Sequence, residues 1–165
     1  MRTLTTMQQS LGLAGWFALT FAASALGAIA SVQAQPFYAQ LTQPDWAPPA
    51  WVFGPVWTTL YAMMALAAWM VWRLGGFNAQ RRALTLFLLQ LLCNTLWSWI
   101  FFSWNLGLLA LIDIGLLWIL IAATLVSFWQ VQPLAGILML PYLAWVSFAA
   151  VLNFSLWHLN PALLG

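Results

Sequence analysis

Residues 44–61, PDWAPPAWVFGPVWTTLY, lie where a proline-rich segment passes into a long apolar run. Proline fixes φ and lacks the backbone N–H that a helix interior needs, so repeated prolines predict turns or extended backbone rather than a helix. The run that follows, residues 51–72, carries no charged side chain and is long enough to cross a hydrocarbon core of roughly 30 Å. The stretch therefore predicts a membrane-spanning helix preceded by a proline-rich connection.

The composition of the whole chain agrees with a membrane location. Of its 165 residues, 65% are hydrophobic and 4% are charged, whereas a soluble domain carries about a quarter of its residues as charged side chains. A water-soluble globular protein is excluded. Four arginines without any lysine cannot provide the basic surface that nucleic-acid binding needs. The single cysteine, Cys93, excludes an internal disulfide and a cysteine-cluster metal site.

Apolar runs of spanning length occur five times. They are residues 11–32, 51–72, 83–102, 107–129 and 134–157. Both faces of every run are apolar, unlike the alternating strands of a membrane barrel. The sequence predicts an all-α membrane protein, a single domain over residues 1–165 built as a five-transmembrane-helix bundle. We expect the first run to be retained as a helix, because it is longer than the apolar region of a signal peptide.

The arginines predict the orientation of this bundle. Arg2 precedes the first span, and Arg73, Arg81 and Arg82 lie in or beside the second connection, so all four fall on one side of the membrane. The positive-inside rule places that side in the cytoplasm. The first connection and the C-terminus then lie on the opposite side.

The first connection, residues 33–50, is long while the others are short. Its prolines and aromatic side chains are Pro36, Tyr38, Pro44, Trp46, Pro48 and Pro49. Short connections make sequential helices antiparallel neighbours, so this segment has to lie over one end of the bundle. Long ordered loops are more often functional than simple tethers. We call residues 33–50 the lid segment and expect it to roof a pocket.

Polar and aromatic side chains recur at helical spacing along three spans. The stripes are Trp57, Tyr61 and Met64; Gln90, Asn94, Trp97 and Phe101; and Pro141, Trp145, Ala149 and Leu152. Polar side chains are costly in lipid, so the stripes should face inward. They predict a flat apolar cavity with a few polar anchors, built by the second to fifth spans and suited to a planar macrocycle or a sterol. Core packing is the alternative role for these aromatics.

Asp113 is the one ionisable side chain deep in a span. It is either protonated or held by a neutral donor such as Asn94 or a tryptophan N–H, and an interhelical hydrogen bond is favoured over a proton-coupled site. The small residues Ala23, Gly27 and Ser31, four apart, are typical of a close helix contact. His158 lies at the last turn near the interface, so we expect no protein ligand to iron, no metal site and no required cofactor.

The stretch 44–61 closely resembles the TspO family, the tryptophan-rich sensory proteins related to the mitochondrial translocator protein (peripheral benzodiazepine receptor). Residues 90–97, QLLCNTLW, and 140–145, LPYLAW, agree with the same family, and the resemblance covers residues 35–153. It implies a five-helix fold, a homodimer and a pocket under the first connection. Family members bind porphyrins and other tetrapyrroles, animal members bind cholesterol and isoquinoline or benzodiazepine ligands, and some members degrade protoporphyrin in light.

The resemblance also implies residue roles. The ligand contacts that follow from it are Trp57, Tyr61, Asn94, Trp97, Trp145 and Ala149, to which the inward stripes add Leu152 and the fourth span adds Asp113. The family tryptophans tied to porphyrin breakdown correspond to Trp57 and Trp145. Trp46, Pro48 and Pro49 of the lid segment would cover the ligand.

The leading hypothesis is a tetrapyrrole receptor or carrier in stress sensing or transport, with protoporphyrin IX as ligand, in a bacterial cell membrane. One alternative is an enzyme that degrades protoporphyrin in light through Trp57 and Trp145. Another is a sterol-binding translocator. Phe154 and His158 disfavour it, because they stand where the animal cholesterol pattern has a tyrosine and a cation.

Overall fold

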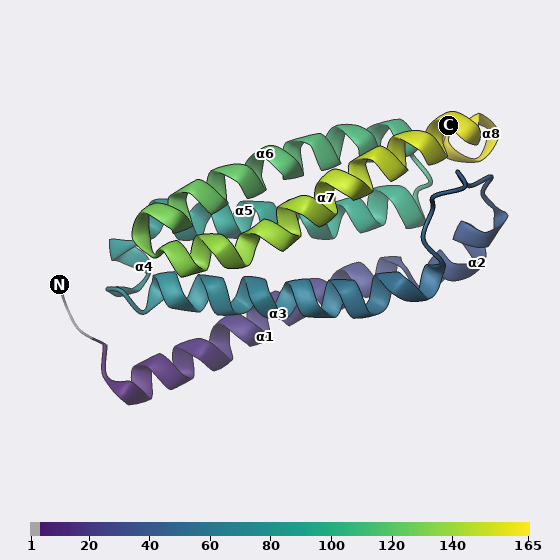
Figure 1. Cartoon of the computed structure of the whole chain (residues 1–165). Helices are drawn as coiled ribbons and strands as arrows, with labels where there is room; N and C mark the ends of the chain where they lie inside the picture. Colours follow the sequence, from purple (N-terminus) through teal and green to yellow (C-terminus); the bar gives the residue numbers. More distant parts are fainter. Residues whose placement is uncertain (1–3) are drawn as a thin grey trace.

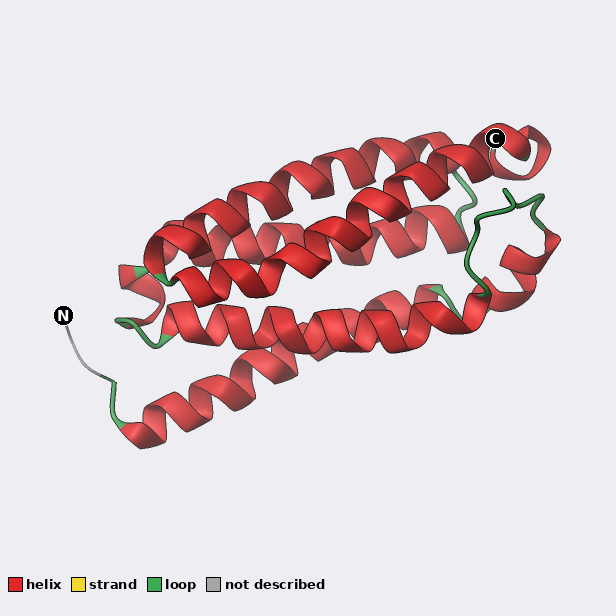
Figure 2. Ribbon diagram, viewed as in Figure 1, coloured by secondary structure: helices red, strands yellow, loops and turns green. Residues whose placement is uncertain are grey.

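The computed structural model describes residues 4–165, and five long helices dominate it (Figures 1 and 2). They are α1 (Thr6–Ala30), α3 (Phe53–Trp72), α5 (Arg81–Ser98), α6 (Gly107–Val131) and α7 (Pro133–Leu159). The short elements are α2 (Ala34–Gln40), a 3₁₀ turn η1 (Ala50–Val52), α4 (Gly76–Ala79), a π-helical turn η2 (Trp99–Ser103) and α8 (Pro161–Leu164). With η1 and η2 included, five segments are long and apolar enough to span a membrane, which confirms the predicted five-helix bundle.

The first span begins earlier than its apolar run predicted, at Thr6 instead of residue 11. Thr5 caps the helix, because its hydroxyl accepts a hydrogen bond from the Gln8 backbone N–H while the Gln8 side chain accepts one from the Thr5 N–H. This capping box satisfies two N–H groups that have no partner inside the helix. A cap made of polar residues therefore sets the start of α1, outside the apolar run.

The helix ends and the connections between them lie at two opposite ends of the bundle (Figure 1). The start of α1 and the turn around α4 lie at one end, while α2, α8 and the C-terminus lie at the other. Arg73, Arg81 and Arg82 flank α4, so these three arginines share one end, as the sequence predicted. Arg2 lies outside the described residues. The direction of the bundle across a membrane stays a prediction.

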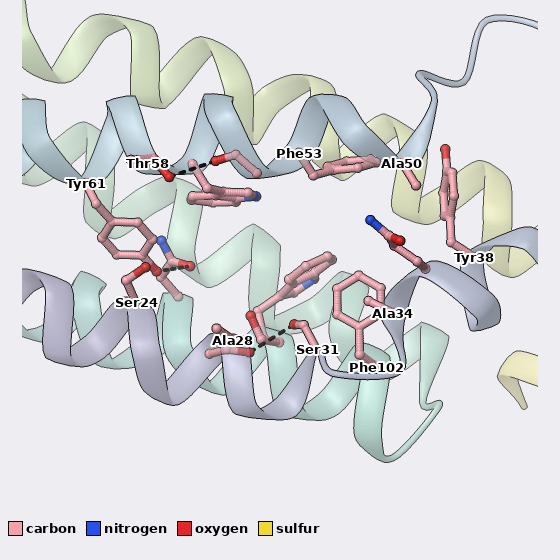
Figure 3. Close-up of a pocket in the computed structure, with 17 residues that line it drawn as sticks. Ser24, Ala28, Ser31, Ala34, Tyr38, Ala50, Phe53, Thr58, Tyr61 and Phe102 are labelled. Atoms are coloured by element: carbon pink, nitrogen blue, oxygen red, sulfur yellow. Dashed lines mark hydrogen bonds between the residues drawn. The ribbon is translucent and has the colours of Figure 1, made fainter.

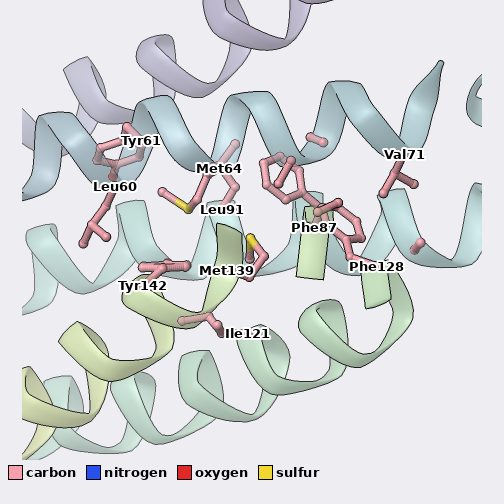
Figure 4. Packing of buried hydrophobic residues seen from close by; sticks show 14 of the residues in the cluster. Leu60, Tyr61, Met64, Val71, Phe87, Leu91, Ile121, Phe128, Met139 and Tyr142 are labelled. Carbon is pink, nitrogen blue, oxygen red and sulfur yellow. The ribbon is translucent and has the colours of Figure 1, made fainter. Parts of the chain in front are cut away.

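The interior is filled by large side chains from four helices (Figure 4). Met64 of α3, Phe87 of α5, Phe128 of α6 and Tyr142 of α7 have no exposed surface. The turn between α6 and α7 is tight, since a Cβ on Gly136 would come within 2.9 Å of Trp129 Cβ. Helices α6 and α7 therefore run close together and leave little free space between them.

The lid segment contains a helix, which corrects the prediction that its prolines exclude one. Helix α2 covers Ala34–Gln40 and holds Pro36 at its third position. The first N–H groups of a helix have no intrahelical acceptor, so proline costs no hydrogen bond there. Residues 41–49 contain no helix, and the remaining prolines of the lid segment lie in this part or at its border with η1.

The small residues of the first span seat α5, as their spacing predicted. The Thr95 hydroxyl donates to the Ala23 carbonyl at 3.3 Å. A Cβ on Gly27 would lie 3.3 Å from Ser98 Oγ. Because the side chains at Ala23 and Gly27 are small, the backbones of α1 and α5 can approach each other closely at these positions.

Candidate ligand pocket

A cavity of about 360 Å³ lies between α1, α3 and α5 at the end of the bundle that α2 covers (Figure 3). Its lining on α1 and α2 is Ser24, Gly27, Ala28, Ser31, Ala34, Gln35 and Tyr38. Its lining on the other elements is Ala50, Phe53, Gly54, Trp57, Thr58, Tyr61, Asn94, Trp97, Ser98 and Phe102. The volume is in the range of small-molecule sites.

Trp97 presents a flat wall whose orientation is fixed on two sides. Its Nε1 donates to Asn153 Oδ1 at 3.1 Å, and its ring stacks on Phe101 with centroids 5.1 Å apart and planes 13° apart. Trp57 also lines the cavity and lies against Tyr61 with ring centroids 5.7 Å apart. The pocket therefore offers ring faces that are positioned before a ligand arrives.

A buried chain of hydrogen bonds closes the inner end of the pocket. The Tyr61 hydroxyl donates to Asn94 Oδ1 at 3.4 Å, and Asn94 Nδ2 donates to the Tyr142 hydroxyl at 2.7 Å. Tyr142 in turn donates to Gln90 Oε1 at 2.9 Å. This chain joins α3, α5 and α7 and holds Asn94 as a polar anchor inside an otherwise apolar space.

The lid segment covers the outer end of the pocket. Tyr38 of α2 lines the cavity, and its hydroxyl donates to the Pro48 carbonyl at 3.0 Å. Burial raises the pKa of Tyr38, so the hydroxyl stays protonated and able to donate at neutral pH. Gln43 Nε2 donates to the Tyr38 carbonyl at 2.6 Å. The lid segment is therefore held in one conformation by its own side chains.

The pocket has no charged side chain among its lining residues. Within residues 4–165, no group of three or more histidine, cysteine, aspartate or glutamate side chains gathers as a metal site would require. The lining offers hydroxyls, amides and indole N–H groups instead. Such a site recognises a ligand through ring stacking and neutral hydrogen bonds.

Four of the predicted ligand contacts line this pocket together: Trp57, Tyr61, Asn94 and Trp97. The other four do not. Trp145 lies behind a lining residue, with its ring 5.9 Å from that of Phe53, and its Nε1 is buried without a hydrogen-bond partner in residues 4–165.

Ala149 packs against the main core and Leu152 belongs to a second buried cluster with Tyr38. In the lid segment, the Trp46 ring lies 5.8 Å from Phe148 of α7, and Pro49 precedes η1. Trp46, Pro48 and Pro49 are thus part of the cover without lining the cavity.

Asp113 bonds to a residue other than the donors expected from the sequence. The Cys93 thiol donates to Asp113 Oδ1 at 3.2 Å, whereas the Asn94 amide is used by Tyr142. Cys93 is on α5 and Asp113 on α6, so the pair is an interhelical hydrogen bond, the role favoured from the sequence. Asp113 Oδ2 is buried with no partner in the part of the chain that the structure describes.

The pocket walls differ from the predicted ones in one respect: α1 replaces α6 and α7. Side chains of α6 and α7 fill the space between these helices, whereas a cavity remains between α1, α3 and α5. Ser24, Gly27, Ala28 and Ser31 provide the α1 wall. Sequence reasoning missed Ser24 and Ala28, although the neighbouring small-residue stripe was the signal that α1 approaches other helices.

Fold and site together define an integral membrane protein of five helices with an uncharged, aromatic pocket under one end. The sequence profile of the TspO/MBR family matches residues 16–158, and the chain belongs to this family.

Named relatives support the same assignment. The chain is 44% identical over 126 residues to the translocator protein of Homo sapiens, covering 75% of each chain. It is 43% identical over 129 residues to the tryptophan-rich protein TspO of Chlorobaculum tepidum, covering 76% of this chain and 80% of that protein. It is 41% identical over 150 residues to protein CrtK of Rhodobacter capsulatus, covering 88% of this chain and 91% of that protein.

Proposed function

We propose that the pocket binds a tetrapyrrole, and that the protein is a membrane receptor or carrier in tetrapyrrole-linked stress sensing or transport. The observation that carries the proposal is the pair of indole rings, Trp57 and Trp97, in one uncharged cavity. Flat aromatic walls favour a flat aromatic ligand because stacking is gained over the whole ring area. Relatives named translocator protein and tryptophan-rich sensory protein agree with a role in transport or sensing.

The lack of charge in the lining also bears on how a porphyrin would be placed. A buried carboxylate without a cationic partner is costly, so the two propionates of protoporphyrin IX should point toward the water-facing end of the pocket, where Gln35 of the lid segment lines the cavity and is exposed. The apolar macrocycle then supplies the contacts with Trp57 and Trp97. Asn94 and Tyr61 lie at the inner end as neutral anchors.

Titration of the purified protein with protoporphyrin IX in the dark, followed by tryptophan fluorescence quenching, tests this proposal. We expect saturable quenching, and we expect protoporphyrin IX dimethyl ester to bind with a Kd within about threefold of the free acid. A threefold change is only about 0.7 kcal/mol, which is small for a recognised carboxylate. Quenching that does not saturate contradicts tetrapyrrole binding; loss of ester binding contradicts the proposed placement.

Repeating the titration in light and in the presence of dioxygen separates the degrading alternative from pure binding. Trp57 lines the cavity, so its oxidisable indole ring would adjoin the ligand. The Trp57 ring in turn lies 6.2 Å from the ring of Tyr142. If the protein degrades porphyrin, the porphyrin absorption falls only under illumination, and Trp57→Phe abolishes the fall. Trp145→Phe then has the smaller effect, because Trp145 is separated from the cavity by Phe53.

Homodimerisation and the binding of sterol, isoquinoline or benzodiazepine ligands stay predictions.

A further inference from the structure

We propose that the ligand enters and leaves the pocket sideways, from the bilayer through an opening between α1 and α3, while the end that faces water stays closed. The inference takes its ligand from the proposed function and adds the route of exchange. It rests on three features: the position of the cavity between two helices, the exposure of particular lining residues and a hydrogen-bonded fastening of the lid segment.

The contacts between α1 and α3 lie on the arginine side of the pocket and are made through side chains. At the arginine end, Trp69 Nε1 donates to the Gln9 carbonyl at 2.8 Å, and Gly12 packs directly on the Trp72 ring. At the edge of the pocket, Phe21 of α1 contacts Tyr61 of α3, with ring centroids 6.3 Å apart. Beyond it the cavity lies between the two helices, as Figure 3 shows.

The lining residues at this gap are small and exposed. Ala28 on α1 and Gly54 and Thr58 on α3 line the cavity and are exposed at the same time. A Cβ on Gly54 would meet no atom within 4 Å. Behind the cavity, the wall is closed, since α1 and α5 touch at Gly27 and Ser98. The cavity therefore opens outward between α1 and α3.

This opening lies at the depth of the hydrocarbon. Thr58 is eight residues after Ala50, the first residue of the second span, which is about 12 Å along a helix axis at 1.5 Å per residue. Molecules that reach Thr58 from outside the bundle come from the lipid phase. A porphyrin macrocycle is apolar and partitions into that phase.

The end that faces water is fastened by Asn160, which follows α7. Asn160 Oδ1 accepts from the Thr42 N–H at 2.7 Å, and Asn160 Nδ2 donates to the carbonyls of Thr42 at 2.9 Å and Leu156 at 2.8 Å. Asn160 is buried, so opening the lid segment would break its two bonds to Thr42, at a cost; the bond to Leu156 joins Asn160 to the last turn of α7 and would remain. The sideways route breaks none of them.

The kinetic test compares two adjacent threonines with matched surroundings. Thr58 and Thr59 are both exposed, and each hydroxyl donates at 2.9 Å to the carbonyl four residues earlier. Only Thr58 lines the cavity. In lipid vesicles, stopped-flow quenching by protoporphyrin IX should show association and dissociation both slowed about tenfold in Thr58→Phe, within the range that association rate constants span among variants of one site. Thr59→Phe should stay within twofold of the unmodified protein.

A third variant tests the other route. Asn160→Ala loosens the lid segment, and we expect its association rate to stay within twofold of the unmodified protein. Faster association and dissociation in Asn160→Ala, with unchanged rates in Thr58→Phe, would overturn the proposal in favour of exchange from water. Faster dissociation alone in Thr58→Phe would also overturn it, because position 58 would then act on the bound ligand.

A second measurement is independent of porphyrin. A nitroxide label at Thr58→Cys, in a Cys93→Ser background, should collide more often with dioxygen, which concentrates in lipid, than with a water-soluble nickel chelate. The control label at Gln40→Cys, on the exposed end of α2, should show the reverse. Greater nickel accessibility at position 58 would overturn the sideways opening. If the label behaves as expected while protoporphyrin IX fails to bind, the proposed function fails and the opening stands.

Discussion

A Tyr142→Phe variant should lose about 2 kcal/mol of unfolding free energy, a large effect for the removal of one oxygen atom. Tyr142 has no exposed surface, and its hydroxyl accepts from Asn94 Nδ2 at 2.7 Å and donates to Gln90 Oε1 at 2.9 Å. Removing it leaves an amide donor and an amide acceptor without partners inside the bundle. Individual hydrogen bonds in membrane bundles average only about 0.6 kcal/mol, so the unsatisfied groups make up most of this loss.

Thermal unfolding in detergent, followed by circular dichroism, measures this loss. Tyr61→Phe is the control within the same chain of bonds, since its hydroxyl makes a single, longer bond of 3.4 Å to Asn94. We expect Tyr61→Phe to cost less than half as much as Tyr142→Phe. Equal melting temperatures for Tyr142→Phe and the unmodified protein would contradict a continuous buried network.

Trp97→Ala should weaken protoporphyrin IX binding about thirtyfold, the largest expected effect on function. A buried aromatic contact at the centre of a site is worth about 2 kcal/mol, and each 1.4 kcal/mol is tenfold in affinity. The Trp97 ring is already fixed by Asn153 and Phe101, so stacking a ligand on it costs no further ordering of this side chain. The shift of the porphyrin absorption band measures binding without relying on protein fluorescence.

Two further variants separate stacking from damage to the fold. Trp97→Phe keeps a ring but loses the bond to Asn153, and should weaken binding by a smaller factor. Trp104→Ala removes an exposed indole at the end of η2, outside the cavity, and should bind as the unmodified protein does. Equal affinities of Trp97→Ala and Trp104→Ala would show that the porphyrin does not contact Trp97.

The spans were predictable from the sequence because chain length and apolarity alone determine whether a segment can cross a bilayer. Hydropathy does not report helix caps, which is why Thr5 and the true start of α1 were missed. A count of prolines also does not show where each proline falls within a helix. Pro36 is compatible with α2 only because it falls in the first turn.

The pocket was predictable in part for a related reason. Helical spacing shows which residues share a face of one helix, and it correctly grouped Trp57 with Tyr61 and Asn94 with Trp97. Spacing does not show which neighbouring helix covers that face. On α7 the predicted inward stripe was wrong in part: Pro141 is exposed, Tyr142 and Val146 are the buried residues beside it, and Trp145 does not reach the cavity.

The part of the pocket wall that α1 provides could not be predicted from the sequence, because its residues contribute by being small. Ser24 and Ala28 carry no aromatic or charged group that would distinguish them. The Cys93–Asp113 bond is equally hidden, since it depends on how α5 and α6 are rotated against each other. Such pairings follow from packing between helices rather than from the pattern along one of them.

The location of the bound ligand tests the central claim most directly. A crystal structure of the protein grown in a lipid phase with protoporphyrin IX should place the macrocycle between α1 and α3, against Trp97, with Asn94 at its inner edge and the propionates toward the lid segment. A macrocycle bound on the outer surface of α6 and α7, with the cavity between α1, α3 and α5 empty, would contradict the account.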